Sequence, residues 1–400
     1  MHMQNPDRAV EESQTDAAAR RAKGEFVRGV SRFRSALGST AFPAEAHRYH
    51  LYVALNCPWS HRVTLARNLL GLQHSITLDV AFPNRTDEAD PEGPNHWQFA
   101  PERIASISQA TLPDCTQETA TGQNFRLLKN IYAKEGSQER SVPVLYDKHS
   151  QSIVSNESAE IVRMMNQNAA ALGSGLADAE RIDLYPADQS LRSQIDALNG
   201  RIYDAVNNGA YKAGFSSDQS VYEAAFHKYF NMLEELNALL QDGRAYLTGE
   251  AFTEADLKLF PTLYRHDPVY YLRMKLNGAK IFNYPDLWGW LCRVYALPGV
   301  AESGSLTHCL QGYFGRSWMA LSRLAPASQG PIQRPIIIRN WQSQPNLSRA
   351  QDSCETHGHQ YRLGLFGPQK SRSNALGPTC FFSRQRVIRS YQSYWRASVQ

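Results

Sequence analysis

The strongest constraint on the fold is a strand pattern that runs directly into a cysteine and a proline. Residues 47–55 (His-Arg-Tyr-His-Leu-Tyr-Val-Ala-Leu) are rich in aromatic and branched side chains, which is typical of a β-strand. Asn56-Cys57-Pro58 follows at once, and apolar residues then recur at helical spacing as far as Gly71, where a helix C-cap belongs. The pattern therefore predicts Cys57 at the junction between a strand and a helix.

The pattern up to residue 166 predicts one compact α/β unit. Further strands are predicted at 75–82, 142–146 and 151–155, and helices near 123–135 and 157–166. The last two strands flank a polar four-residue turn, as in a hairpin. The order β-α-β, insertion, β-β-α is the arrangement of a thioredoxin-like domain.

A helical region follows a linker near 167–186. Apolar residues at three/four spacing predict helices over 188–206, 218–241, 253–264 and 284–295. Thr253-Glu-Ala-Asp256 forms a capping box, with Phe252 and Leu257 as its hydrophobic staple. The fold class is therefore α+β, with an N-terminal thioredoxin-like domain followed by an all-α domain. The expected boundaries are an arm at 1–46, the two domains at 47–168 and 187–325, and a tail at 331–400.

The two ends of the chain differ from its centre in composition. The arm is polar, with Phe26, Val30 and Phe33 as its apolar anchors on the body. Residues 331–400 hold ten Arg or Lys and two acids, a net charge of +8, and no core-forming pattern. We expect a disordered tail, and favour a solvated segment over one that contacts nucleic acid.

The overall composition excludes several other classes of protein. The 42 Lys and Arg against 38 Asp and Glu are too balanced for a chain that binds nucleic acid along its whole length. No window approaches the roughly 18–20 apolar residues of a membrane helix, so we expect a soluble protein. The six cysteines form no CxxC or Cys/His metal spacing. Hence we expect a cytoplasmic location and no metal.

Cys57 is the candidate nucleophile. Pro58 occupies the first helical position, so the sulfur lies over unpaired N–H groups at the positive end of the helix dipole, which favours a thiolate. Position 60 is Ser, so a mixed disulfide at Cys57 must be resolved by an outside thiol. The alternative is an inert buried cysteine, which is the commoner case, but the position between strand and proline favours the nucleophile.

Two further features are predicted to lie at the same edge of the domain. A cis Val142–Pro143 peptide would turn the Val142 backbone toward an extended peptide ligand, although spacing alone favours trans. Asn156-Glu157-Ser158 opens a helix and could hold the charged ends of an amino acid, or could be an ordinary N-cap. Together with Cys57, these features describe a site for a small thiol peptide.

These motifs make the chain resemble a glutathione transferase and, more narrowly, a glutathionyl-hydroquinone reductase of the Xi class. The resemblance covers about residues 24–330. It rests on motifs in the family's order: Arg48 to Tyr52, Cys57 to Arg62, Ser141 to Leu145, Asn156 to Ser158, Asn207 to Phe215, Thr253 to Asp256, Phe260 to Asp267 and His308 to Gly315.

The resemblance implies roles for individual residues. Cys57 matches the nucleophile, and Tyr211 matches the tyrosine that handles the hydroquinone proton. Tyr270 and Tyr313 match phenols that crowd the sulfur; packing within the helices is the alternative for any one of these tyrosines. The implied glutathione contacts are Trp97, Glu139, Arg140, Ser141, Val142, Glu157 and Ser158.

The implied reaction is the glutathione-dependent reduction of S-glutathionyl-hydroquinones, with quinone or hydroquinone conjugates and glutathione as partners. Glutathione serves as co-substrate, and the resemblance also suggests a homodimer. Two other functions stay open: an Omega-like thiol transferase or dehydroascorbate reductase, which needs Cys57 but not the tyrosines, and a non-catalytic ligand-binding protein of the same fold.

Overall fold

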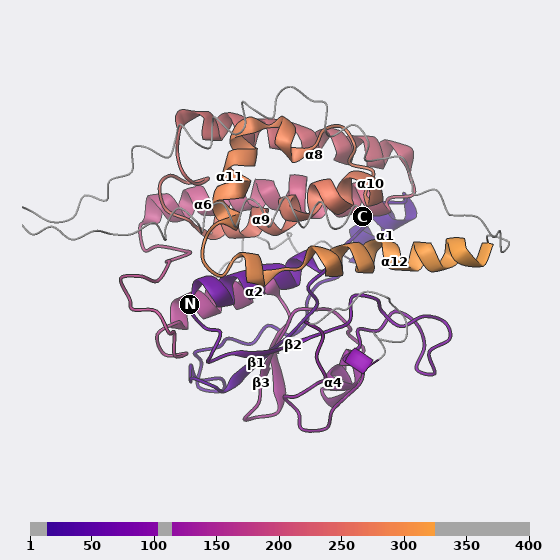
Figure 1. Ribbon diagram of the computed structural model, residues 1–400, viewed down its shortest axis with the longest axis vertical. Helices are drawn as coiled ribbons and strands as arrows, with labels where there is room; N and C mark the ends of the chain where they lie inside the picture. The colour runs from indigo at the N-terminus through magenta and orange to yellow at the C-terminus, as the bar shows by residue number, and fades with distance from the viewer. Residues whose placement is uncertain (1–13, 103–113, 325–400) are drawn as a thin grey trace, which may run out of the picture. The chain divides into compact units, whose positions relative to one another are not determined.

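The structure is a computed structural model that describes residues 14–102 and 114–324. The basic tail that the sequence predicts at 331–400 lies outside the described residues. The described chain has two parts: a β-sheet with its own helices, followed by a group of helices (Figure 1). This order agrees with the predicted α+β class.

The sheet has four strands, each at its predicted place within a few residues. They are β1 (Tyr49–Val53), β2 (Thr77–Val80), β3 (Val144–Asp147) and β4 (Ser152–Ser155), in the order β2-β1-β3-β4. β1 and β2 are parallel, whereas β3 is antiparallel to both β1 and β4. A parallel pair needs a crossover, and the helix after Cys57 supplies it.

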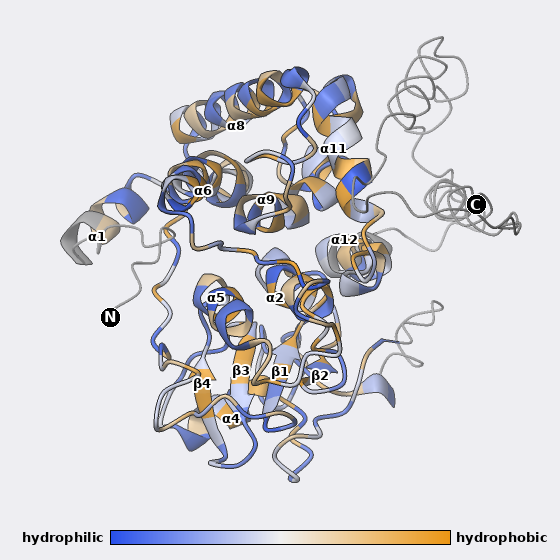
Figure 2. Ribbon diagram, turned by 90° about the vertical axis from the view of Figure 1, so that its left-hand side faces the viewer, coloured by the Kyte–Doolittle hydropathy of each residue, from blue (hydrophilic) through white to orange (hydrophobic). Residues whose placement is uncertain are grey.

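Both faces of the sheet are buried. Tyr49, Leu51 and Val53 of β1 face the cluster formed with α2 (Pro58–Leu69) and α5 (Ser158–Asn168). Tyr52 faces the opposite cluster, which includes Leu128, Ile131 and Tyr132 of α4 (Leu128–Lys134). Figure 2 shows α2 and α5 over one face of the sheet and α4 beyond the other. The alternation follows from the two-residue period of a strand.

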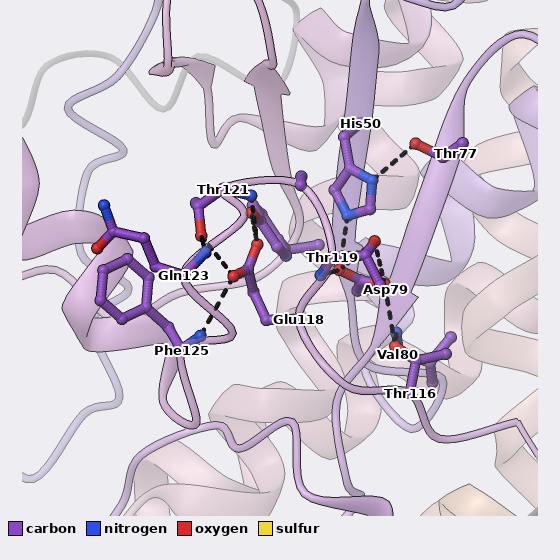
Figure 3. A network of polar contacts seen from close by, with 12 residues as sticks. His50, Thr77, Asp79, Val80, Thr116, Glu118, Thr119, Thr121, Gln123 and Phe125 are labelled. Atoms are coloured by element: carbon purple, nitrogen blue, oxygen red, sulfur yellow. Dashed lines mark hydrogen bonds and ion pairs between the residues drawn. The ribbon is translucent and has the colours of Figure 1, made fainter.

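A buried polar network ties the segment after β2 to the sheet (Figure 3). His50 Nε2 lies 3.1 Å from Asp79 Oδ2, and Asp79 also accepts hydrogen bonds from the Thr116 hydroxyl and the Thr119 backbone N–H. Nearby, Glu118 accepts a 2.8 Å bond from the Tyr52 hydroxyl. These bonds hold the irregular stretch 116–121 against the sheet.

The second part of the chain is helical. Its helices are α6 (Gln189–Ile202), α7 (Asn208–Phe215), α8 (Gln219–Leu239), α9 (Glu254–Arg265), α10 (Tyr271–Arg273), α11 (Pro285–Tyr295) and α12 (Leu306–Leu324). α9 packs against α2, so the two parts share one core cluster. Every residue of α9 is buried, which makes it the central element of the helical part.

The predicted capping box at the start of α9 is present. The Thr253 N–H donates to Asp256 Oδ2 at 3.0 Å, and the staple residues Phe252 and Leu257 are both buried. Asp256 also accepts hydrogen bonds from the Leu247 N–H and the Trp290 indole N–H, so one carboxylate joins three segments. The box therefore fixes both the start of the helix and its neighbours.

Several elements of the helical part were not predicted as such. α7, α10 and α12 are absent from the sequence-based helices, and π-helical turns cover Tyr203–Asn207 and His266–Tyr270. α7 contains two glycines within eight residues, which lowers its helix propensity, so packing against α8 decides its conformation. The π turns follow the helices that periodicity does predict.

The N-terminal arm crosses from the helical part to the sheet. After α1 (Gln14–Ala22), the Phe26 ring lies 5.8 Å from the Tyr211 ring, and the Phe33 ring lies 5.5 Å from that of Tyr132. Both residues act as the predicted anchors. Val30 does not, because it is 74% exposed between these two contacts.

Candidate active site

Cys57 lies at the head of α2, as predicted. It is the N-cap residue, with extended backbone angles, and Pro58 follows at the first helical position. Its side chain is half-buried, and Sγ lies 3.8 Å from the Val142 carbonyl oxygen. Among the described residues, no side chain caps this helix start. The backbone N–H groups of the first turn and the positive end of the helix dipole therefore lie at the sulfur, which is the setting of a nucleophilic cysteine.

The Val142–Pro143 peptide is cis, which corrects the expectation of trans. Position at the start of a strand carries no information about the isomer, because both isomers keep the φ angle of proline. Val142 itself is buried and its carbonyl faces Cys57.

The start of α5 offers unsatisfied polar groups. Glu157 is the N-cap residue, and its side chain accepts hydrogen bonds from the Ala159 N–H at 3.3 Å and the Ser31 hydroxyl at 3.1 Å. The Ser158 hydroxyl is buried with no hydrogen-bonding partner among the described residues. A buried hydroxyl without a partner at a helix N-terminus suits a ligand carboxylate.

Asn156 joins several of the predicted glutathione contacts. Its side-chain amide donates to the Tyr132 hydroxyl at 3.1 Å, to the Ser141 hydroxyl at 3.2 Å and to the Glu139 carboxylate. Glu139 also accepts a hydrogen bond from the backbone N–H of Arg32 in the N-terminal arm. Sequence reasoning placed Asn156 in the motif but assigned it no role in joining these residues.

Of the remaining predicted contacts, one is buried and one is exposed. Trp97 is buried, its indole N–H has no hydrogen-bonding partner among the described residues, and the Arg85 guanidinium lies over its ring at 4.4 Å. Trp97 belongs to the apolar cluster against which Cys57 packs. Arg140 is exposed at the surface.

Three tyrosines from three different elements meet on the helical side of the site. The Tyr211 and Tyr313 hydroxyl oxygens are 3.1 Å apart, and the Tyr270 ring lies 6.4 Å from that of Tyr211 and 5.8 Å from that of Tyr313. Burial raises the pKa of all three phenols well above the ordinary value. They therefore stay protonated, and each can donate its proton to a developing negative charge.

The two π turns place two of these tyrosines. Tyr211 lies one turn beyond the π turn at Tyr203–Asn207, and Tyr270 closes the turn at His266–Tyr270. A π turn inserts one residue into a helix, which rotates the residues that follow about the helix axis. The tyrosines therefore approach one another at angles that helical periodicity does not predict.

The structure thus places the start of α2 next to both groups of predicted residues. Cys57 Sγ lies near Val142 and packs against the cluster that includes Trp97, and the Trp59 ring, two residues after Cys57, lies 6.3 Å from the Tyr211 ring. The sequence predicts Phe26 as an apolar anchor of the arm but does not predict that it packs on Tyr211 and Phe215.

A thioredoxin-like domain with a half-buried cysteine at a helix N-terminus, joined to an all-α domain, defines a glutathione transferase. Family comparison agrees. Residues 56–168 match the family described as "Glutathione S-transferase, N-terminal domain", and residues 219–293 match "Glutathione S-transferase, C-terminal domain".

Individual relatives narrow the class. The chain is 38% identical to glutathionyl-hydroquinone reductase YqjG of Escherichia coli, over 85% of this chain and 94% of the relative. It is 36% identical to the glutathione S-transferase omega-like 2 of Schizosaccharomyces pombe, over 77% and 94% of the two chains.

Solved structures give the same class. The crystal structure of the glutathione S-transferase Xi from Phanerochaete chrysosporium superposes with a TM-score of 0.63 at 36% identity, covering 77% of this chain and 98% of that one. The glutathione-bound structure of Escherichia coli YqjG gives a TM-score of 0.62 at 38% identity, covering 78% and 96%. The protein belongs to the Xi class of glutathione transferases, the glutathionyl-hydroquinone reductases, and is a glutathione-dependent enzyme.

No helix within residues 14–102 and 114–324 combines the length and apolar character that a membrane crossing requires.

Proposed function

We propose that the enzyme reduces S-glutathionyl-hydroquinones to hydroquinones, with release of oxidised glutathione, through a mixed disulfide between Cys57 and glutathione. In the first half-reaction the Cys57 thiolate attacks the sulfur of the conjugate. The new S–S bond forms as the bond between sulfur and the aryl carbon breaks. The electron pair goes to that carbon, which takes a proton from the Tyr211 hydroxyl, and the hydroquinone leaves.

The second half-reaction restores the enzyme. The thiolate of a second glutathione attacks the glutathione sulfur of the mixed disulfide, oxidised glutathione leaves, and Cys57 returns as a thiolate. The thiol proton of this second glutathione replaces the one that Tyr211 gave up. Overall, one conjugate and one glutathione give one hydroquinone and one oxidised glutathione. The sulfurs of the conjugate and of the second glutathione are oxidised, and the aryl carbon is reduced.

The observation that carries the proposal is a thiol at a helix N-terminus whose first turn packs near a pair of protonated phenols. Cys57 is the N-cap of α2, the Trp59 ring in the first turn of that helix lies 6.3 Å from the Tyr211 ring, and the Tyr211 and Tyr313 hydroxyls are hydrogen-bonded to each other. A displacement at sulfur needs a nucleophile on one side and an acid for the leaving carbon on the other. The unpartnered Ser158 hydroxyl and Trp97 indole N–H support the assignment of the glutathione end.

The test is an acid quench of the enzyme during turnover of a synthetic S-glutathionyl-hydroquinone. We expect an adduct of about 305 Da, a glutathione less two hydrogens, on the peptide that contains Cys57. Cys57→Ser is expected to lose both the adduct and turnover. Cys292→Ser, which changes a half-buried thiol on α11, is the matched control and is expected to keep both. Full turnover by Cys57→Ser would contradict the proposal.

The second candidate is an Omega-like thiol transferase or dehydroascorbate reductase. The name of the Schizosaccharomyces pombe relative favours it. Such a reaction needs Cys57 but no acid for a leaving carbon. Assaying Tyr211→Phe on an S-glutathionyl-hydroquinone and on dehydroascorbate separates the two candidate functions. Under our proposal the variant loses activity on the S-glutathionyl-hydroquinone but keeps its activity on dehydroascorbate.

A further inference from the structure

Arg265, the last residue of α9, is a positively charged side chain in the interior of the protein. Its side chain is fully buried, and its guanidinium is enclosed by the helical part of the chain on one side and the head of α2 on the other. The sequence motifs that define the site gave it no role. A buried cation loses much of its hydration, so its hydrogen-bonding partners must compensate for that lost hydration.

The hydrogen-bond acceptors of Arg265 among residues 14–102 and 114–324 are all neutral. It donates to the Leu55 carbonyl at 2.7 Å, the Asn56 carbonyl at 3.2 Å and the Pro261 carbonyl at 2.8 Å, and its Nη1 lies 2.8 Å from His61 Nδ1. None of its contacts with the described residues is an ion pair with a carboxylate. The cation is therefore held in place by dipoles but is not neutralised by them.

The contact with His61 fixes both side chains. Since a guanidinium only donates, His61 Nδ1 accepts and its Nε2–H donates to the Ser303 hydroxyl at 2.9 Å. The Ser303 hydroxyl in turn donates to the Val300 carbonyl at 2.6 Å. Burial and the Arg265 charge lower the pKa of His61 well below its ordinary value, so the imidazole stays neutral. A chain of three side chains thus orients the guanidinium.

The carbonyls that Arg265 holds belong to the two residues directly before Cys57. The Asn56 carbonyl is part of the peptide bond that leads into Cys57, so the guanidinium fixes the turn that presents the nucleophile. The titratable groups around it are the Cys309 thiol and Tyr313 phenol of α12, the Tyr270 and Tyr264 phenols, and His61. Burial raises the pKa of Cys309, Tyr270 and Tyr313, so these groups remain uncharged.

We propose that Arg265 is a positioning residue for the reaction: it holds the Leu55–Asn56 turn and supplies a buried positive charge that the Cys57 thiolate balances. This inference rests on the role proposed for Cys57. The neighbouring thiol and phenols are neutral, so the charge of the site is closest to balance when Cys57 is ionised. Attack on the conjugate removes that charge, and the second half-reaction restores it.

The test measures the alkylation rate of Cys57 by iodoacetamide between pH 5 and 9, with peptide mapping, in the absence of any conjugate. We expect Arg265→Gln, which removes the charge, to move the midpoint of the pH profile upward by about one pH unit, or about ten-fold in rate below the midpoint. Arg265→Lys keeps the positive charge but lacks the forked guanidinium group, so we expect a smaller upward shift of the midpoint. A merely structural role would lower the thermal stability of both variants and leave the midpoint unchanged. A wild-type midpoint in folded Arg265→Gln overturns the proposal.

A second pair of variants decides the matter if Arg265→Gln does not fold. Ser303→Ala removes the acceptor of the His61 Nε2–H and so loosens the orientation of Arg265 from a distance. Ser75→Ala is the matched control, because it removes an equally buried hydroxyl whose one bond within the described part of the chain is to the Leu72 carbonyl at 3.4 Å. We expect the midpoint of Cys57 alkylation to rise in Ser303→Ala and to stay at the wild-type value in Ser75→Ala. Equal midpoints in the two variants would overturn the proposal.

The same assay distinguishes this proposal from the proposed function. If Arg265→Gln moves the midpoint of Cys57 alkylation upward but no glutathione adduct forms during turnover of the wild type, the proposed reaction fails while the effect of Arg265 on Cys57 stands. If the adduct forms and Arg265→Gln alkylates like the wild type, only the role of Arg265 fails.

Discussion

The Tyr211 hydroxyl is the proton donor that we propose for the leaving hydroquinone, and its removal is a sharp test of that role. Tyr211→Phe keeps the ring contacts with Phe26 and Tyr270 but loses the hydroxyl. We expect kcat for an S-glutathionyl-hydroquinone to fall by about 10²-fold or more, because general acid catalysis contributes on that scale. Alkylation of Cys57 by iodoacetamide should stay within about two-fold of the wild type, since it needs no acid.

Tyr313→Phe is the matched variant for Tyr211→Phe. It removes the hydroxyl that lies 3.1 Å from that of Tyr211 and leaves the donor itself in place. The loss of one neutral hydrogen bond predicts a smaller fall in kcat, of about five-fold. Equal losses in the two variants would mean that the phenols act as a pair and that neither is the single donor.

Single residues differ in how far the sequence predicts them. Cys57 is predictable because its surroundings are local: the strand, the proline and the first helical turn are all contiguous in the chain. Arg265 is not, because its partners Leu55 and Asn56 are about two hundred residues away and its own neighbours read as a helix interior. The residues that we propose for glutathione binding lie between these cases. Glu157 and Ser158 form a helix start that is recognisable in the sequence, whereas the bonds of Asn156 to Glu139 and Ser141 are not.

Among the elements, those with strong periodicity were predictable and those set by tertiary contact were not. The four strands and the helices α2, α5, α8, α9 and α11 carry a clear apolar period, and the structure has them at the predicted places. The π turns before α7 and at the end of α9 have no such signal. Asn207 illustrates the reason, because its amide donates to the Lys258 carbonyl at 3.1 Å and to the Thr262 hydroxyl at 2.7 Å, both on α9.

The start of α9 is the element on which the helical part depends, and Asp256 is its most demanding residue. Asp256→Ala removes the acceptor for the Thr253 N–H, the Leu247 N–H and the Trp290 indole N–H, all of which are buried. Each unsatisfied donor costs about 1–3 kcal/mol, so we expect a loss of at least ~3 kcal/mol in the free energy of unfolding. Urea denaturation followed by circular dichroism measures it.

Asp242→Ala is the control for this prediction. Among the described residues, Asp242 bonds only to Arg244, at the surface after α8, so its substitution should change the free energy of unfolding far less than Asp256→Ala does. A loss for Asp256→Ala no larger than that of the control would show that the capping box does not anchor α9.

At the scale of the whole molecule, the core contains imidazoles that fold in the neutral form. His61, His266 and His308 are fully buried, and burial lowers the pKa of His266 and His308 to about 4. The unfolded chain binds protons at these sites near pH 6.5, whereas the folded chain does not until about pH 4. Their contribution to stability is therefore complete above pH 6.5 and is lost as the pH falls toward 4. Asp267 opposes them in part, because burial raises its pKa to about 6.

His266→Gln isolates one of these contributions from the others. His266 accepts from the Tyr229 hydroxyl at 2.8 Å and donates to the Ala279 carbonyl at 2.9 Å, and a glutamine amide can replace both bonds without titrating. We expect the variant to lose less stability than the wild type between pH 6.5 and 4, with a slope smaller by up to ~1.4 kcal/mol per pH unit. The opposing effect of Asp267 is present in both proteins and cancels in the comparison. The measurement is urea denaturation at several pH values, with exposed His74→Gln as a control that should keep the wild-type slope. A wild-type slope in His266→Gln would mean that this imidazole gains its proton without unfolding the domain, and acid sensitivity would then have to originate elsewhere in the core.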